Sequence, residues 1–537
     1  KVRHSAIATK VEKNMKKLDR TLYFAIAFSY LCLTNNYQTI AQIIPDTTLP
    51  SNSIAIPDGN SIRIEGGTTN GSNLFHSFQE FSVPTGSEAF FNNSLDIQNI
   101  FSRVTGSNIS NIDGLIKANG TANLFLINPN GIIFGPNAQL NIGGSFLGST
   151  ANSIRFADGI EFSATNPTVP SLLSINVPIG LQLGPNPAQI SVAGNGHDFT
   201  ASGPQPFWFP LRRSSDSNAG LRVKPGKTFA LVGGDINLSG GILAAPSGRI
   251  ELGSVKEGSV SINPNVSGWS LGYSGVQNYG DIQLTSRALV DVSAAGSGSI
   301  FVQTGSLRMR DTSLILSRNF APLPAGDIEI HATGLVELSN PIGDPAIDTA
   351  VMSEGIAGPA ANLTVSSQRL ILSDGGDLNT YTYFPAEGGK LTVNVTESTA
   401  IIGTSPLTPP AVSTIQSFNL GPGQGGDTIL TTGQLRLDGG GAIGSTTAGT
   451  GNGGSVTIKA TGGIEVTGFE PITLIPSNVN AASIGTGNAG NLTLEAASLT
   501  VRDGGRVEGS TFASAEAGSV TIKATDFVEI SGKPSVS

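Results

Sequence analysis

The chain has 537 residues, of which 38% are hydrophobic, 13% are charged and 69 are glycines. This composition supplies enough apolar side chains for a core and excludes a disordered chain, while the glycine content favours many turns. The formal net charge of −9 at pH 7 excludes nucleic acid as an expected partner, because nucleic acid is bound by basic surfaces.

Residues 1–41 are predicted to be a signal peptide. A basic start is followed by an apolar run over residues 22–33, which is too short to span a bilayer as a stable helix. Cleavage is expected after Ala41, and residues 1–14 are interpreted as a spurious upstream extension. The only cysteine, Cys32, lies within this segment, so we expect a mature chain without disulfides. No later apolar run approaches spanning length, so we expect no integral membrane segment in the mature chain.

A turn tetrapeptide, Asn128-Pro129-Asn130-Gly131, lies between two short apolar runs. Pro129 fixes φ for the second position of the turn, and Asn130 and Gly131 tolerate left-handed backbone. The apolar runs cover residues 123–127 and 132–135. The pattern therefore predicts a strand, a sharp corner and a second strand.

This corner, together with the stretches 71–78 and 81–84 upstream of it, resembles the secretion domain of filamentous haemagglutinin-like exoproteins. The resemblance covers residues 45–160 and implies two-partner secretion, in which an outer-membrane pore transporter recognises the N-terminal domain through periplasmic recognition domains. It implies a secreted or cell-surface product that passes through the periplasm and the outer membrane. A single-chain autotransporter would also export a solenoid, but the corner favours the two-partner route.

The family motif falls on residues 128–131, and the resemblance implies that these residues present the recognised surface. Two interpretations remain open: Asn128 and Asn130 either contact the partner or only close a turn on which the fold depends. The family also often carries an earlier Asn-Pro-x-Leu motif. Its candidate counterpart in this chain is a secondary motif formed by Asn119, Asn123 and Leu124.

A proline-dense segment over residues 204–213 cannot form a central strand and is predicted to leave the fold as a loop. Aromatic and basic side chains adjoin one another in it. The loop is therefore either an exposed contact surface or a segment that packs against the flank of the fold. The candidate contact residues are Phe207, Trp208, Phe209, Arg212 and Arg213.

The C-terminal half is repetitive. A small residue followed by a short alternating strand recurs at Gly298, Gly326, Ala361, Gly389, Gly426, Gly454, Gly490 and Gly518. Short steps of about 28 residues alternate with long steps of about 36 residues, so the true unit is a pair of roughly 63–65 residues. The strand patterning has period two, and no part of the mature chain has sustained helical spacing.

These features predict an all-β fold, a right-handed parallel β-helix (solenoid) with N-terminal capping elements. We expect each unit to contain three coils of roughly 21 residues. Residues 42–230, which are rich in phenylalanine, are interpreted as the secretion and cap domain with the first coils. Residues 231–537 are interpreted as the regular rod, which looks truncated because the last residues lie within a repeat.

Catalytic, metal and cofactor sites are not expected. The three histidines of the mature chain, His76, His197 and His331, lie far apart without metal-ligand spacing. The competing interpretation is a secreted β-helix polysaccharide lyase or hydrolase, since carboxylates recur in one phase of the unit, but Ile401 interrupts that phase and favours solvated positions. The phased carboxylates are Glu337, Glu465 and Glu529. We therefore predict a non-enzymatic, adhesin-like exoprotein with an unknown surface glycan or protein receptor.

Overall fold

The computed structural model describes residues 42–167, 173–200, 210–213, 219–265, 268–342, 347–405 and 412–532. The chain divides into two compact units, Lys1–Ile40 and Ala41–Ser537. The predicted signal segment lies outside the described residues, so the signal peptide and the upstream extension stay predictions. Every regular element within the described ranges is a β-strand, and no helix there could cross a membrane.

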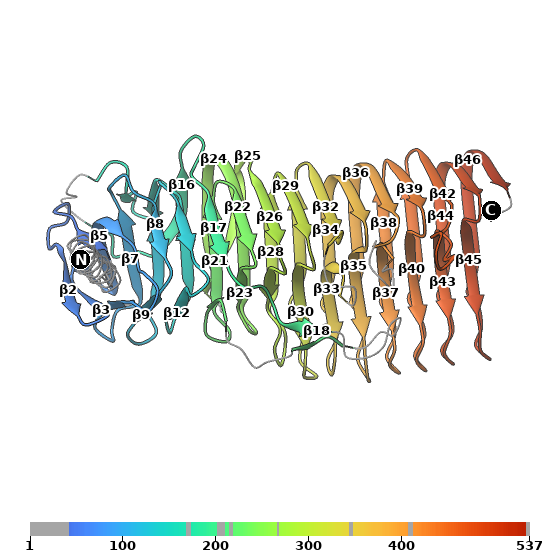
Figure 1. Ribbon diagram of the computed structural model, residues 1–537, viewed down its shortest axis with the longest axis horizontal. Helices are drawn as coiled ribbons and strands as arrows, with labels where there is room; N and C mark the ends of the chain where they lie inside the picture. Colours follow the sequence, from blue (N-terminus) through green and yellow to red (C-terminus); the bar gives the residue numbers. More distant parts are fainter. Residues whose placement is uncertain are drawn as a thin grey trace, which may run out of the picture. The chain divides into compact units, whose positions relative to one another are not determined.

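The strands of the second unit stack into three parallel ladders, and each turn of the chain passes through all three (Figure 1). The first ladder contains β5 (Asn73–Phe81), β7 (Asn99–Val104), β10 (Asn123–Ile127), β13 (Phe146–Ser149), β21 (Thr228–Gly233), β24 (Arg249–Asn265), β28 (Ser299–Thr304), β31 (Ile328–Ala332), β34 (Leu363–Ser373), β36 (Leu391–Ile402), β38 (Thr428–Thr432), β41 (Val456–Ala460), β44 (Leu492–Arg502) and β46 (Val520–Ser531). The parallel solenoid predicted from the repeat is thereby confirmed.

The second and third ladders form the other two faces. The second contains β8 (Ser110–Ile112), β11 (Ile132–Phe134), β17 (Ile190–Ala193), β22 (Ile236–Ser239), β26 (Asp281–Thr285), β29 (Ser306–Arg310), β32 (Leu335–Ser339), β39 (Gln434–Asp438), β42 (Gly463–Thr467) and the C-terminal parts of β34, β36, β44 and β46. The third consists of two sheets that follow one another. The first sheet contains β3 (Ser61–Gly66), β6 (Glu88–Phe91), β9 (Leu115–Ala118) and β12 (Gln139–Asn141), and the second contains β20 (Leu221–Arg222), β23 (Ile242–Ala244), β27 (Leu289–Asp291), β30 (Leu314–Asn319), β33 (Thr349–Gly355), β35 (Gly376–Thr382), β37 (Thr414–Asn419), β40 (Ala442–Thr447), β43 (Asn478–Ser483) and β45 (Arg506–Thr511).

The remaining strands lie at the N-terminal end or on the flanks. β1 and β4 pair antiparallel with β5, and β2 pairs antiparallel with β3. β14, β15, β16, β24 and β25 form an antiparallel layer, and β18 pairs with β19. Their bounds are β1 (Ile43–Pro45), β2 (Ser53–Asp58), β4 (Thr68–Asn70), β14 (Ser153–Phe156), β15 (Glu161–Ser163), β16 (Pro178–Leu183), β18 (Phe199–Thr200), β19 (Arg212–Arg213) and β25 (Gly268–Tyr279).

The expected division of the repeat unit into three coils is wrong, because the unit contains two. In the first ladder Ile300 pairs with Ile328, Ile328 with Leu363, and Leu363 with Leu391, so a short coil alternates with a long one. The extra length of every second coil lies at the corner between the second and third ladders. Three residues separate β29 from β30 there, whereas nine separate β32 from β33.

The aliphatic core runs along the inside of the ladders. Ile300, Ile328, Leu363 and Leu391 follow one another in register, and all four are essentially inaccessible to solvent. Side chains of alternate residues point to opposite faces of a strand, so period-two patterning gives each coil its inward set. Stacking in register at ~4.8 Å lets each rung pack on the next.

The recurring glycines are explained by close approach of neighbouring coils. A Cβ built on Gly454 would lie 1.9 Å from the carbonyl oxygen of Gly426, and one on Gly490 would lie 2.0 Å from that of Gly454. Real Cβ atoms do not come so close to backbone, so a side chain at either position would push the coils apart. The small-residue signal in the sequence therefore marks a crowded corner.

The register also corrects the phase of the carboxylates. Glu337 pairs with Ile371, which pairs with Ala400, so Ala400 and not Ile401 occupies the equivalent place, and Ile401 lies in the core. Corner lengths differ between units, so a constant step of 64 residues from Glu337 misses the structurally equivalent position by one residue. In this outward row Ile371, Ala400 and Arg436 separate Glu337 from Glu465, and Thr500 separates Glu465 from Glu529.

Candidate functional site

The predicted corner lies between β10 and β11 and is a closed turn. The Gly131 amide donates to the Asn128 carbonyl oxygen at 3.1 Å, and the Asn130 amide donates to Asn128 Oδ1 at 2.9 Å. Gly131 has a φ of 122°, a value that favours glycine. Backbone and side chain of Asn128 thus close the same turn.

Asn128 is fully buried, at 0% exposure, and every polar atom of its side chain has a partner. Its Nδ2 donates to the Asn108 carbonyl oxygen at 3.0 Å and to Ser110 Oγ at 2.9 Å. Asn108 lies in the corner of the preceding coil, and Ser110 is the first residue of β8, which follows that corner. Asn128 therefore joins two successive corners, and it has no surface to offer a partner in the folded domain.

Pro129 and Asn130 are the partly exposed members of the corner. Asn130 Nδ2 donates to the Gly106 carbonyl oxygen at 2.7 Å and to Asn128 Oδ1 at 3.1 Å, so its side chain is fixed on the surface of the preceding coil. Asn128 is therefore the buried anchor of the motif, and Pro129 and Asn130 form its solvent-facing edge. The role of the motif in recognition stays a prediction.

The residues of the secondary motif belong to side-chain ladders. Asn123 Nδ2 donates to Asn99 Oδ1 at 2.9 Å, and Asn99 Nδ2 donates to Asn73 Oδ1 at 3.0 Å. At another corner, the Asn119 amide donates to Asn93 Oδ1 at 2.9 Å. Leu124 lies in the core. These contacts stabilise stacking of the first coils, and a separate role in secretion stays a prediction.

Sequence reasoning missed Asn73 and Asn99 as partners of Asn123. A signal was present, because each of the three precedes an aliphatic residue and a phenylalanine, in Asn73-Leu74-Phe75, Asn99-Ile100-Phe101 and Asn123-Leu124-Phe125. The three phenylalanines stack on the outer side of the first ladder, with ring centroids 5.1 Å and 4.8 Å apart. The antiparallel flank covers them, since the ring centroid of Trp269 in β25 lies 4.7 Å from that of Phe125.

A buried arginine network was also missed. Arg103 donates to Ser77 Oγ at 2.9 Å, to the Ser163 carbonyl oxygen at 2.7 Å and to Thr48 Oγ1 at 2.9 Å. Desolvation by burial lowers the pKa of Arg103 to about 10, although the nearby Asp46 carboxylate opposes the shift. The network ties the N-terminal strands and the flank to the first ladder. No local pattern around Arg103 marks it in the sequence.

The candidate contact loop is only partly described, because Phe207, Trp208 and Phe209 lie outside the described residues. Arg212 is exposed in β19. Arg213 forms an ion pair with Asp291 of β27 at 2.6 Å. Packing against the flank therefore occurs at Arg213, while the contact role of the loop stays a prediction.

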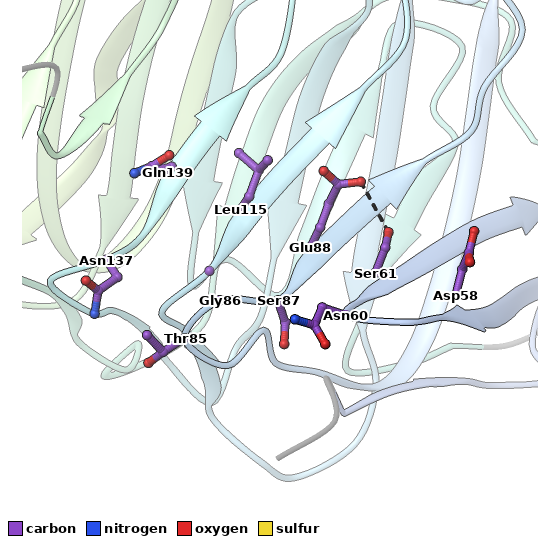
Figure 2. A pocket seen from close by; sticks show the side chains of 11 residues that line it. Asp58, Asn60, Ser61, Thr85, Gly86, Ser87, Glu88, Leu115, Asn137 and Gln139 are labelled. Carbon is purple, nitrogen blue, oxygen red and sulfur yellow. Dashed lines mark hydrogen bonds between the residues drawn. The ribbon is translucent and has the colours of Figure 1, made fainter. Parts of the chain in front are cut away.

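A polar groove of 670 Å³ opens along the third ladder near the N-terminal end, and Figure 2 shows its lining. Ser61 Oγ donates to Glu88 Oε1 at 3.2 Å, and Lys117 lies 3.5 Å from the same oxygen. Glu88 therefore forms structural contacts with Ser61 and Lys117 on the neighbouring strands. The groove contains none of the predicted site residues; it is lined by Asp58, Asn60, Ser61, Thr85, Gly86, Ser87, Glu88, Gly114, Leu115, Asn137 and Gln139.

The histidines have structural surroundings. His76 is buried, with Nδ1 3.0 Å from Ser53 Oγ, and desolvation lowers its pKa to about 3. His197 Nε2 lies 2.7 Å from the Thr312 carbonyl oxygen, and burial lowers its pKa to about 4. His331 lies 3.6 Å from Glu329. Within the described ranges, no group of three or more His, Cys, Asp or Glu could hold a metal ion.

One pair of carboxyl groups has strongly altered acidity. Asp348 and Asp377 are hydrogen-bonded to each other, and desolvation by burial raises the pKa of Asp348 to about 6 and that of Asp377 well above its usual value. The Thr414 amide and hydroxyl both donate to Asp377 Oδ1, at 2.8 Å and 3.0 Å. Asp377 is buried in β35 of the third ladder, and Asp348 is half-buried in the corner that precedes β33.

The parallel solenoid and its asparagine-anchored corner are the features expected of a β-helical exoprotein. The model of the TPS secretion domain family matches residues 41–302. This part of the chain belongs to that family, and the protein is an exoprotein of two-partner secretion. It is recognised by an outer-membrane transporter and exported to the cell surface or the extracellular space.

Two solved structures are similar to the chain. One is the HMW1 secretion domain from Haemophilus influenzae, with 15% identity, a TM-score of 0.44 and coverage of 91% of this chain and 99% of that chain. The other is a filamentous hemagglutinin secretion domain, with 14% identity, a TM-score of 0.31 and coverage of 66% and 99%. No curated protein matches the chain. The matched range 41–302 extends beyond residue 230, and the domain boundary there stays a prediction.

Proposed function

We propose that the protein is a non-enzymatic, adhesin-like rod whose corner at residues 128–131 is read by the periplasmic domains of its transporter. The observation that carries this proposal is the division of the corner: Asn128 is a buried anchor with partners for every polar atom, while Pro129 and Asn130 remain partly exposed. A rigid, solvent-facing edge on the secretion domain suits recognition by a partner. The coils that follow carry the contacts to a surface glycan or protein receptor.

A non-enzymatic rod agrees with the arrangement of its carboxylates. Glu337 and Glu465 face outward in the second ladder, and Ile371 and Ala400 follow Glu337 in that row. Glu465 pairs with Arg502 at 2.5 Å. Paired acid and base groups in an open groove, as glycoside hydrolysis requires, are not formed by these side chains.

The test is pore-dependent release of the mature chain behind a working signal peptide, for the native sequence and for Asn128→Ala, Asn130→Ala and Asn137→Ala. Asn137 is a matched control, since it lies in the exposed turn after β11. Its backbone amide donates to Asp113 Oδ1 at 2.8 Å, and its side-chain Nδ2 donates to Asp113 Oδ2 at 3.1 Å. Thermal unfolding of each purified chain separates loss of fold from loss of recognition.

We expect Asn130→Ala to reduce release while its unfolding temperature stays close to that of the native chain. Asn128→Ala should lower both, because it leaves buried donors and acceptors unpaired at about 1–3 kcal/mol each. Asn137→Ala should change neither. Equal release of all four chains without the transporter would refute the proposed recognition.

A further inference from the structure

A strap formed by residues 197–200 and 210–213 crosses the outer face of the third ladder. β18 and β19 pair antiparallel within it, and Figure 1 shows β18 beside β30. Phe199 is 1% exposed and Leu211 is 8% exposed. Both pack in a separate apolar cluster with Leu289, Leu314, Leu316, Ile347, Ala350 and Met352.

Polar contacts hold Leu211 of the strap in place. Arg318 donates to the Leu211 carbonyl oxygen at 2.6 Å and forms an ion pair with Glu354 at 2.5 Å. The Leu211 amide donates to the same Glu354 carboxylate at 3.4 Å. The Arg318 and Glu354 side chains are only 9% and 1% exposed. Their mutual ion pair and the Leu211 backbone therefore have to replace the water that both charges lose on burial.

These contacts connect parts of the chain that are distant in sequence. Leu211 is 107 residues from Arg318 and 143 residues from Glu354, whereas paired strands of the rod are much closer in sequence, as Ile300 is to Ile328. In a solenoid each repeat contacts only its neighbours. The strap breaks this rule, because its docking site consists of β27, β30 and β33, which follow it in the chain.

We propose that the strap is a late-closing latch, open while residues 289–354 are unfolded and closed once these coils have stacked. The inference rests on the proposed function, because it assigns the open strap to the chain during export. The closed strap then belongs to the protein after export. Closure joins the secretion domain and the first rod coils into one cooperative unit. The site for Leu211 does not exist before Arg318 and Glu354 are in register.

The absence of cysteine from residues 42–537 permits a direct test by thiol labelling. Two single-cysteine chains of residues 42–537 are prepared, Leu211→Cys in the strap and Val351→Cys, which faces the core of β33. Each is refolded from denaturant and pulsed with a maleimide at increasing times. We expect Val351→Cys to become protected first and Leu211→Cys later.

The docking face is then altered by Leu316→Glu with Met352→Glu, whose outward side chains contact the strap. The matched control is Gln416→Glu, because Met352 pairs with Asn379 and Asn379 with Gln416 along the same row. We expect Leu211→Cys to label about tenfold faster or more in the altered chain, with Val351→Cys still protected. Gln416→Glu should leave both rates unchanged.

Two results would overturn the latch: protection of Leu211→Cys before Val351→Cys, or equal protection of Leu211→Cys in the altered and native chains. The labelling needs no transporter, so it stays informative if pore-dependent release fails. Conversely, if release depends on the transporter but Leu211→Cys closes early, the secretion proposal stands and only the latch is lost.

Discussion

Single buried side chains determine how the first coils join. Asn128 shows this most clearly, because its amide links its own turn with the corner of the preceding coil. The sequence predicted the turn, since the order of Asn, Pro, Asn and Gly is itself a backbone signal. It could not predict which asparagine is buried, because that depends on Asn108 and Ser110, which belong to another coil.

The carboxyl pair at the third ladder makes stability depend on pH. Burial raises the pKa of Asp348 to about 6 and that of Asp377 well above its usual value. Between the unfolded and folded pKa values the folded chain binds more protons, so its unfolding free energy falls as pH rises. The stabilisation is present below about pH 4 and is lost as the pH passes through the folded pKa values.

We therefore predict that Asp377→Asn raises the unfolding free energy at pH 8 by on the order of 1–3 kcal/mol. The amide keeps an oxygen for Thr414, which donates to this position twice, but removes one charge. Thermal unfolding between pH 4 and pH 8 tests this, with exposed Asp526→Asn as the control. A difference that is the same at both pH values would contradict the prediction.

At the scale of the element, strands carry the pairing and corners carry the variation in length. The corner between the second and third ladders has two residues between β34 and β35 but eleven between β36 and β37. The length of the repeat unit could be predicted from the recurring glycines, because the backbones of neighbouring coils approach closely at the same corner of every coil. The number of coils was not, since a sequence interval does not show how many residues a loop takes outside the ladders.

The long corners should therefore be dispensable. We predict that replacing residues 403–412 by Gly-Gly, which copies the short corner before β40, changes the unfolding free energy by about 1 kcal/mol or less. Gly439 and Gly440 adopt φ values of 61° and 100° in that corner, which glycine supplies readily. The buried Ser413 is retained, because its hydroxyl accepts from the Gly375 amide at 3.1 Å.

Chemical unfolding measures the effect of this replacement. The control deletes residues 428–435, which shortens the chain by the same net amount and removes β38 and the start of β39. We expect the control to lose stability strongly, since it breaks pairing in two ladders. Comparable losses in both chains would show that the long corner is part of the folding unit.

At the scale of the molecule, the chain combines near-neighbour stacking with contacts between distant parts of the sequence, of which the strap is one. Alternating strands, glycine corners and the Asn128 turn made the solenoid and the secretion domain predictable, because each leaves a local pattern. The strap, the Arg103 network and the Asp348–Asp377 pair were not predictable. Their partners come from coils far apart in sequence, and no periodicity connects Leu211 with Glu354.

The two-coil unit itself can be tested by deletion. Removing residues 428–491 takes out one complete two-coil unit and would place Leu492 where Thr428 pairs with Leu391. The short corner after β39 is replaced by the short corner after β44, so the alternation of corners is kept. We predict a folded solenoid with unchanged strand content per residue by circular dichroism, because solenoid repeats interact only with their neighbours. Removing residues 428–448 instead, one third of the unit, should disrupt strand pairing. If that shorter deletion kept the same strand content, the repeat unit would contain three coils after all.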